Sequence, residues 1–204
     1  MTDRALARAI SLVILAAGVA SCGNQSSPTT TGSHTAAAGS PSVESSGNPP
    51  PLTQTFASAL MGYSVSYPEG WNPAPATTLW EPGGSNFWDD PVGDRIESAT
   101  AGFRGTSQAL PADQSPDEWL QAYLADAPTD CGEPEQIVVD GATGTIDLNG
   151  CDGLGRLGGR VYDVVVVADG RGYDFTMEGD VDHALLVAML GTVSLEPANA
   201  ASTN

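Results

Sequence analysis

Residues 161–177 read VYDVVVVADGRGYDFTM, and this stretch decides the fold class. Its first half is apolar on both faces apart from Asp163, a pattern typical of a central strand in a sheet. Asp169-Gly170 favours a tight turn. After it, apolar residues at positions 173, 175 and 177 alternate with polar ones, which predicts a second strand. The stretch therefore predicts an antiparallel hairpin.

Patterns on either side of the hairpin extend the sheet and add two helices. Strands are predicted at residues 63–67, 95–103, 137–139 and 144–148, with a turn at 140–141 between the last two. A helix is predicted after Ser115, where Pro116 suits the first helical position and Glu118 completes a capping box. A second helix is expected from about Val181 to Leu190. This order of elements is typical of an α+β domain built on an antiparallel sheet.

The N-terminal segment is predicted to direct export. Residues 9–20, AISLVILAAGVA, are apolar or small and follow Arg4 and Arg8. As a helix they would span about 18 Å, less than the ~30 Å hydrocarbon core of a membrane, which favours a signal peptide over a spanning helix. The sequence VASC at 19–22 resembles the bacterial lipobox, in which the cysteine thiol receives diacylglycerol. We expect residues 1–21 to be removed and Cys22 to carry the lipid; the alternative is an ordinary secretory peptide.

The rest of the chain divides by composition. Residues 22–51 are rich in Ser, Thr, Gly and Pro and contain no aromatic residue, so they are expected to form a flexible tether. A single folded domain is expected at residues 52–197, where all four tryptophans lie, and a disordered tail at 198–204.

The charge of the chain restricts its partners. The chain has 25 acidic residues and seven arginines, which gives a net charge of −18. Nucleic-acid binding is disfavoured, because it depends on basic side chains that displace counterions from phosphates. Attachment to anionic lipid headgroups through charge is disfavoured for the same reason. The expected membrane contact is therefore the lipid on Cys22, at the extracytoplasmic face of the cell membrane.

Residues 62–71, GYSVSYPEGW, carry a resemblance to a known family. Followed by a helix, a valine-rich hairpin and a C-terminal helix, they resemble the PsbP-like fold, in which a G-Y-x-V-x-Y-P-x-x-W strand opens a curved antiparallel sheet sandwiched by helices. The chain is similar in particular to actinobacterial lipoproteins that carry such a domain behind a lipobox. Over residues 56–197 the resemblance implies an extrinsic subunit or interaction module, and it implies no catalytic or metal-ligating residue.

The two remaining cysteines, Cys131 and Cys151, are predicted to form a disulfide. An even pair in an exported domain favours this reading. The alternative is a reactive thiol or a metal pair, but the spacing matches no zinc pattern and no histidine lies nearby in the sequence.

Catalytic patterns are weak. His34 lies in the tether and His183 at the start of the second helix, and no G-x-S-x-G motif is present, so a Ser-His enzyme is disfavoured. The acidic stretch 147–153 does not match a calcium loop, and the alternatives for the acidic loop 88–94 are a weak ion site or a solvated loop; for both stretches a solvated loop is favoured. A glycine-rich run at 153–159 precedes a strand and so does not indicate a dinucleotide site. We predict no metal and no cofactor.

Large aromatic residues supply the candidate binding surface. Trp80, Phe87 and Trp88 lie in Pro/Gly-rich segments beside acidic residues, as the aromatic anchors of interfaces often do. The alternative is that they cover one end of the sheet, whereas Trp71 is expected in the core. The predicted function is a non-enzymatic binding module for an envelope protein or small ligand. Two alternatives are a hydrolase that uses paired carboxylates and a carrier of a small apolar ligand between sheet and helix.

Overall fold

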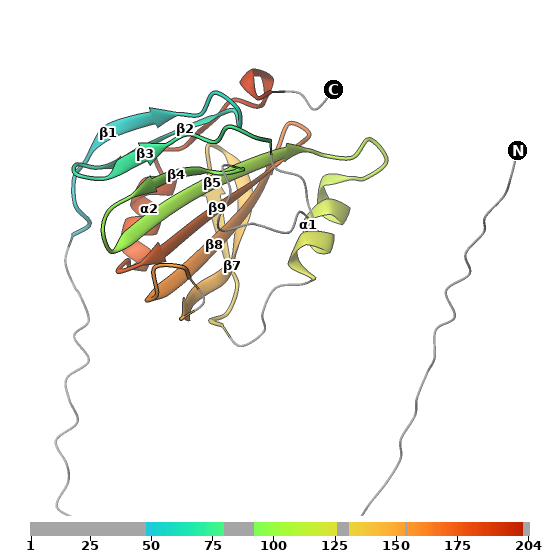
Figure 1. Ribbon diagram of the computed structural model, residues 1–204. Helices are drawn as coiled ribbons and strands as arrows, with labels where there is room; N and C mark the ends of the chain where they lie inside the picture. The colour runs from blue at the N-terminus through green and yellow to red at the C-terminus, as the bar shows by residue number, and fades with distance from the viewer. Residues whose placement is uncertain (1–47, 80–91, 126–130, 154, 202–204) are drawn as a thin grey trace, which may run out of the picture. The chain divides into compact units, whose positions relative to one another are not determined.

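A computed structural model describes residues 48–79, 92–125, 131–153 and 155–201 (Figure 1). Cys22 and the candidate aromatic surface of Trp80, Phe87 and Trp88 lie outside these described residues. Within them, no helix is both long enough and apolar enough to cross a membrane.

The larger of two antiparallel sheets has seven strands, and the predicted hairpin lies at its centre (Figure 1). Its strand order is β3-β4-β5-β9-β8-β7-β6. The strands are β3 (Asn72–Ala74), β4 (Asp94–Glu97), β5 (Ala101–Ala109), β6 (Glu135–Val139), β7 (Ala142–Asp152), β8 (Arg160–Ala168) and β9 (Arg171–Gly179).

Both predicted Asp-Gly turns are confirmed. The pair of β8 and β9 residues nearest the turn is Ala168 and Arg171, so the loop between the strands is Asp169-Gly170. Asp169 has a φ of 47° and Gly170 a φ of 76°, the conformation of a two-residue turn that needs positive φ at both positions. Residues 140–141 join β6 to β7 in the same way, with φ values of 47° and 81°.

The strand predicted at 95–103 is wrong as a single element, because a turn divides it into β4 and β5. Ser98 makes the turn: its hydroxyl accepts a hydrogen bond from the Ala101 N–H (3.0 Å) and donates one to the Ala101 carbonyl (3.1 Å). Its backbone N–H also donates to that carbonyl at 2.8 Å. A serine side chain that bonds the backbone nearby reverses the chain where alternation alone suggests one strand.

A smaller sheet of three strands has the order β1-β2-β10. Its centre is β2 (Tyr63–Pro68), the predicted opening strand, flanked by β1 (Leu52–Ala57) and β10 (Ser194–Leu195). Neither flanking strand was predicted. In β1 only Phe56 is buried, so its hydrophobic alternation is weak, and β10 is two residues long.

The helices begin close to where the capping residues place them. Helix α1 (Pro116–Leu124) has the predicted capping box: the Ser115 N–H donates to Glu118 Oε2 (2.9 Å), and the Glu118 N–H donates to Ser115 Oγ (3.3 Å). Helix α2 (His183–Leu190) begins two residues later than predicted, because Asp182 is its N-cap.

The predicted disordered tail also needs correction in part. A 3₁₀ turn covers Pro197–Asn199, and the Ala201 N–H donates to the Leu60 carbonyl at 2.9 Å.

Helices cover both faces of the large sheet, which confirms the predicted α+β class with a sandwiched antiparallel sheet. Along β8, Val164 and Val166 enter a main core shared with α2 and the smaller sheet, while Val165 faces α1. Glycines permit close packing on each face. A Cβ at Gly105 would lie 2.5 Å from the Tyr63 ring, and one at Gly172 would lie 2.6 Å from Trp119 Cζ2 and closer still to Cη2.

Candidate functional site

The most unusual chemistry in the described residues lies on the α1 face of the large sheet. Because Tyr173, Phe175 and Met177 of β9 enter the main core, the alternate residues Asp174 and Thr176 face α1. Strand pairing then brings side chains from β5, β7 and β8 to the same face. We call the resulting group the carboxyl cluster; its residues are Asp147, Asp163, Asp174, Arg104, Thr176 and the α1 residue Tyr123.

Hydrogen bonds link the side chains of the carboxyl cluster, and one of them joins the sheet to α1. Thr176 Oγ1 lies 3.0 Å from Asp163 Oδ1 and 3.4 Å from Asp174 Oδ1. The Tyr123 hydroxyl donates to the other oxygen, Asp174 Oδ2, at 2.5 Å. The carboxyls are well shielded, since Asp163 is 8% exposed and Asp174 only 1%. The cluster is therefore part of the interior and holds the last turn of α1 to the sheet.

Burial and mutual repulsion alter the acid–base properties of the carboxyl cluster. Burial, followed by the negative charges of Asp174 and Asp147, raises the pKa of Asp163 well above the usual range of an aspartate. The pKa of Asp147 rises to about 6, again chiefly through burial. Burial lowers the pKa of Arg104, and the charges of Asp174 and Asp163 oppose that change. The neighbouring charge of Asp174 therefore adds to burial in favouring the protonated form of Asp163.

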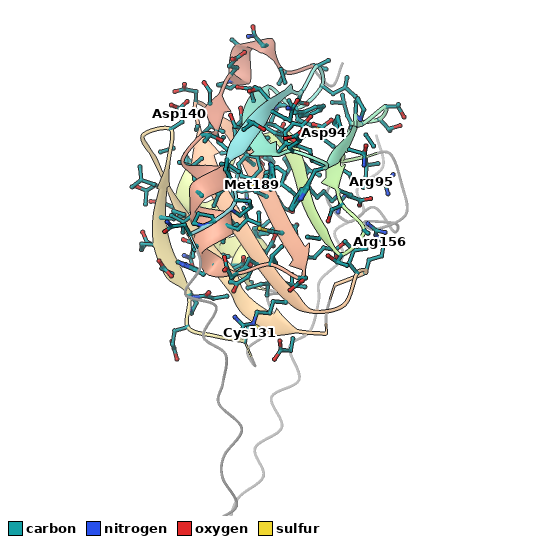
Figure 2. The ribbon with its side chains drawn as sticks, turned by 90° about the vertical axis from the view of Figure 1, so that its left-hand side faces the viewer. Asp94, Arg95, Cys131, Asp140, Arg156 and Met189 are labelled. Carbon is teal, nitrogen blue, oxygen red and sulfur yellow. A yellow bond between two sulfur atoms is a disulfide. The ribbon has the colours of Figure 1, made fainter. Side chains whose placement is uncertain are left out.

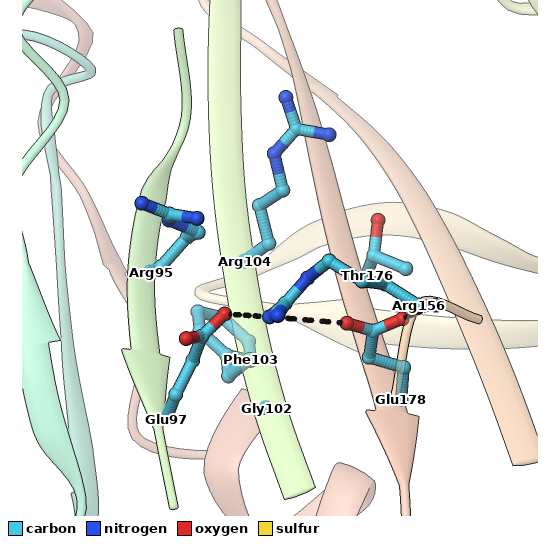
Figure 3. Close-up of a pocket in the computed structure, with 8 residues that line it drawn as sticks. All are labelled: Arg95, Glu97, Gly102, Phe103, Arg104, Arg156, Thr176 and Glu178. Atoms are coloured by element: carbon cyan, nitrogen blue, oxygen red, sulfur yellow. Dashed lines mark hydrogen bonds and ion pairs between the residues drawn. The ribbon is translucent and has the colours of Figure 1, made fainter. Parts of the chain in front are cut away.

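A shallow pocket adjoins the carboxyl cluster at the β4–β5–β9 end of the same face (Figure 3). Arg156 reaches across it, bonded to Glu97 on one side and with Nη2 3.6 Å from Glu178 Oε1 on the other. The Arg156 backbone N–H also donates to Glu178 Oε2 at 2.6 Å. The enclosed space holds about one water molecule. Eight residues line it: Arg95, Glu97, Gly102, Phe103, Arg104, Arg156, Thr176 and Glu178.

The predicted disulfide is confirmed. The Sγ atoms of Cys131 and Cys151 are 2.00 Å apart and the Cα atoms 5.0 Å apart. The bond ties the segment before β6 to the end of β7; Figure 2 shows Cys131 at the lower end of the domain.

The other acidic and histidine side chains considered as candidate ligands or bases contact neighbouring parts of the fold. Asp147 and Asn149 lie in β7 rather than in a solvated loop, and the Asn149 amide donates to the Glu133 carbonyl at 3.2 Å. Asp94, also expected to be solvated, is buried, and its Oδ1 accepts from the Ala76 N–H at 2.8 Å. His183 lies at the start of α2, 3.0 Å from Glu135 Oε2. In the ranges that the structure covers, no three His, Cys, Asp or Glu side chains are grouped so as to hold a metal ion.

No protein-family model matches the sequence, and no curated protein matches it either. Several solved structures are similar to it, including these two. The solution structure of cyanobacterial PsbP (CyanoP) from Synechocystis sp. PCC 6803 has 12% identity and a TM-score of 0.43, over 70% of this chain and 91% of that one. A crystal structure from Bacteroides thetaiotaomicron VPI-5482 has 12% identity and a TM-score of 0.39, over 71% of this chain and 49% of that one. No residue role, ligand or partner carries over from either.

Proposed function

We propose that the protein is a lipoprotein of the extracytoplasmic face of the cell membrane, and that its folded domain is a non-enzymatic binding module. The proposed anchor is a diacylglycerol on Cys22, whose two acyl chains suffice for stable attachment. The Cys131–Cys151 disulfide supports export, because such bonds persist in oxidising compartments. The net charge of −18 supports a lipid anchor over attachment to anionic headgroups.

The burial of the carboxyl cluster carries the non-enzymatic part of the proposal. A general acid acts only within hydrogen-bonding reach of the atom that it protonates. Asp163 and Asp174 are instead bonded to Thr176 and Tyr123 beneath α1. In the adjoining pocket, Glu97 and Glu178 are paired with Arg156. These carboxyls are therefore engaged in contacts within the domain, and we assign the proposed contact with a partner to Trp80, Phe87 and Trp88.

One observation favours the paired-carboxylate hydrolase as a second candidate. Asp163 and Asp174 face each other, and the pKa of Asp163 is raised, as that of a carboxyl acting as a general acid often is. Such an activity would require α1 to move so that a substrate reaches the pair. Hydrolysis of an envelope polysaccharide by the wild type and not by Asp163→Asn would replace the binding-module proposal with this one.

The anchor is tested by labelling with fatty acid in cells that process lipoproteins. We expect the wild type to incorporate labelled palmitate and to sediment with membranes, and Cys22→Ala to do neither. A Cys131→Ser/Cys151→Ser variant is the matched control and should keep its label. Label that persists in Cys22→Ala would disprove the anchor.

Binding is tested by chemical cross-linking of the full-length chain in intact cells, with the cross-linked products identified by mass spectrometry. We expect the wild type to cross-link reproducibly to one envelope component and Trp80→Ala/Trp88→Ala to lose that product. Trp71→Phe is the control, because Trp71 packs against the main core. If the double variant gives the same products as the wild type, the aromatic surface is not the contact.

A further inference from the structure

Helix α1 is held to the large sheet by two different contacts. Near its start, the Trp119 ring lies over Gly172 and packs with Val165. In its last turn, the Tyr123 hydroxyl donates to Asp174 Oδ2 at 2.5 Å. The second contact is unusual because its acceptor belongs to a group of buried carboxyls. How firmly the end of α1 is docked therefore depends on the charge of that group.

Each element packed around Asp163 contributes a charged or titratable group. Asp174 faces it from β9, Asp147 from β7, Arg104 from β5 and Tyr123 from α1. With all three carboxyls ionised, these five groups carry a charge of −2 in a site shielded from water. A proton on Asp163 reduces that charge to −1 and removes the repulsion between the Asp163 and Asp174 carboxyls.

From this geometry we propose that α1 is a proton-controlled clamp, docked while Asp163 carries a proton and loosened when that proton is lost. Without it, two buried carboxylates repel each other across the Thr176 hydroxyl. Water would relieve the repulsion. The other face of β8 and β9 is filled by the main core, so water enters from the α1 side.

The direction of the response follows from the linkage between proton binding and docking. Burial raises the pKa of Asp163 in the docked state, so the docked state holds a proton that the undocked state releases. Rising pH therefore favours undocking, which uncovers the apolar patch of Trp119, Val165 and their neighbours. This regulation goes beyond the proposed binding function and does not depend on the lipid anchor.

Hydrogen exchange of the full-length chain, purified in detergent, tests the clamp. Protection factors, corrected for the intrinsic pH dependence of exchange, are measured from pH 5 to 8 for peptides covering α1 and α2. We expect protection of α1 to fall by up to tenfold per pH unit over part of this range, and protection of α2 to fall less. Asp163→Asn keeps a hydrogen-bonding side chain that does not titrate, so its α1 protection should change less with pH than that of the wild type, with Asp147 as the carboxyl of the cluster that still titrates. A wild-type α1 without pH dependence, or an equal slope in Asp163→Asn, would overturn the proposal.

A second measurement covers the case in which Asp163→Asn folds poorly. Carbon-13 labelling of the aspartate carboxyls in the wild type reports the titration of Asp163 directly. We expect its midpoint to lie well above the ordinary aspartate value of about 3.9 and to coincide with the fall in α1 protection. An ordinary midpoint, or one that does not coincide with that fall, would show that no proton on Asp163 controls α1.

Discussion

Replacing Gly172 with alanine should displace Trp119 and weaken the attachment of α1. A Cβ at this position would lie 2.6 Å from Trp119 Cζ2 and 2.7 Å from Cζ3, whereas nonbonded carbons normally approach to about 3.5 Å. The indole must therefore move by about 1 Å. Such overpacking costs about 1–3 kcal/mol, and removing a glycine from a strand returns about 0.5–1 kcal/mol. We expect the free energy of unfolding to fall by about 1–2 kcal/mol.

Urea denaturation measures this change as a shift of the midpoint. With a slope of about 2 kcal/mol per molar urea, the midpoint should fall by about 0.5–1 M. Gly102→Ala is the matched control, because Gly102 faces the same side of the sheet and its added Cβ would meet only flexible side chains, Leu157 at 3.3 Å and Glu97 at 3.4 Å. In a double-mutant cycle, Trp119→Leu should absorb part of the cost of Gly172→Ala. Strictly additive effects, or a neutral Gly172→Ala, would show that the indole does not occupy this position.

Three further predictions concern stability, each measured by urea denaturation. Tyr123→Phe removes the donor to the buried Asp174 carboxyl and should lower the free energy of unfolding by about 1.5–3 kcal/mol; no change would mean that water replaces the hydroxyl. Because burial raises the pKa of Asp147 from 3.8 to about 6, this side chain binds a proton more tightly in the folded protein than in the unfolded chain. Wild-type stability should therefore fall, relative to Asp147→Asn, by up to about 3 kcal/mol between pH 4 and 6 and stay level above that; parallel pH profiles would contradict this. Cys131→Ser/Cys151→Ser should lower stability by about 3 kcal/mol, and reduction of the wild type should have the same effect but leave the double variant unchanged.

The fold was predictable wherever a local signal determines a local structure. The Asp-Gly turns require positive φ, and the Ser115–Glu118 capping box is a contact between neighbouring residues, so both follow from short stretches of sequence. The missed elements depend on distant partners. β10 is a strand only because Ser194 and Leu195 pair with β2, and β1 buries one side chain of six. The division at Ser98 was missed because its side-chain hydrogen bonds outweigh the alternation pattern.

The carboxyl cluster was only partly within reach of the sequence. Asp163 stood out as the polar residue in an otherwise apolar strand, and the tight Asp-Gly turn sets the register that places it opposite Thr176. From that register, Asp174 is expected on the same face, two positions along β9. The contributions of Tyr123, Arg104 and Asp147 depend on how α1, β5 and β7 pack against the hairpin. No short-range pattern specifies that packing.

The attachment of β1 has a mechanical consequence. A pull transmitted along the chain from its N-terminal side enters the domain at Leu52, and Leu52 pairs with Pro68 at the open end of the β1–β2 hairpin. Tension directed away from the sheet would break the hydrogen bonds of this ladder one after another, starting there, rather than loading them together. β1 would therefore separate from β2 at a lower force than a strand whose hydrogen bonds are loaded together. This step would break no ladder bond of the seven-stranded sheet, to which β1 does not belong.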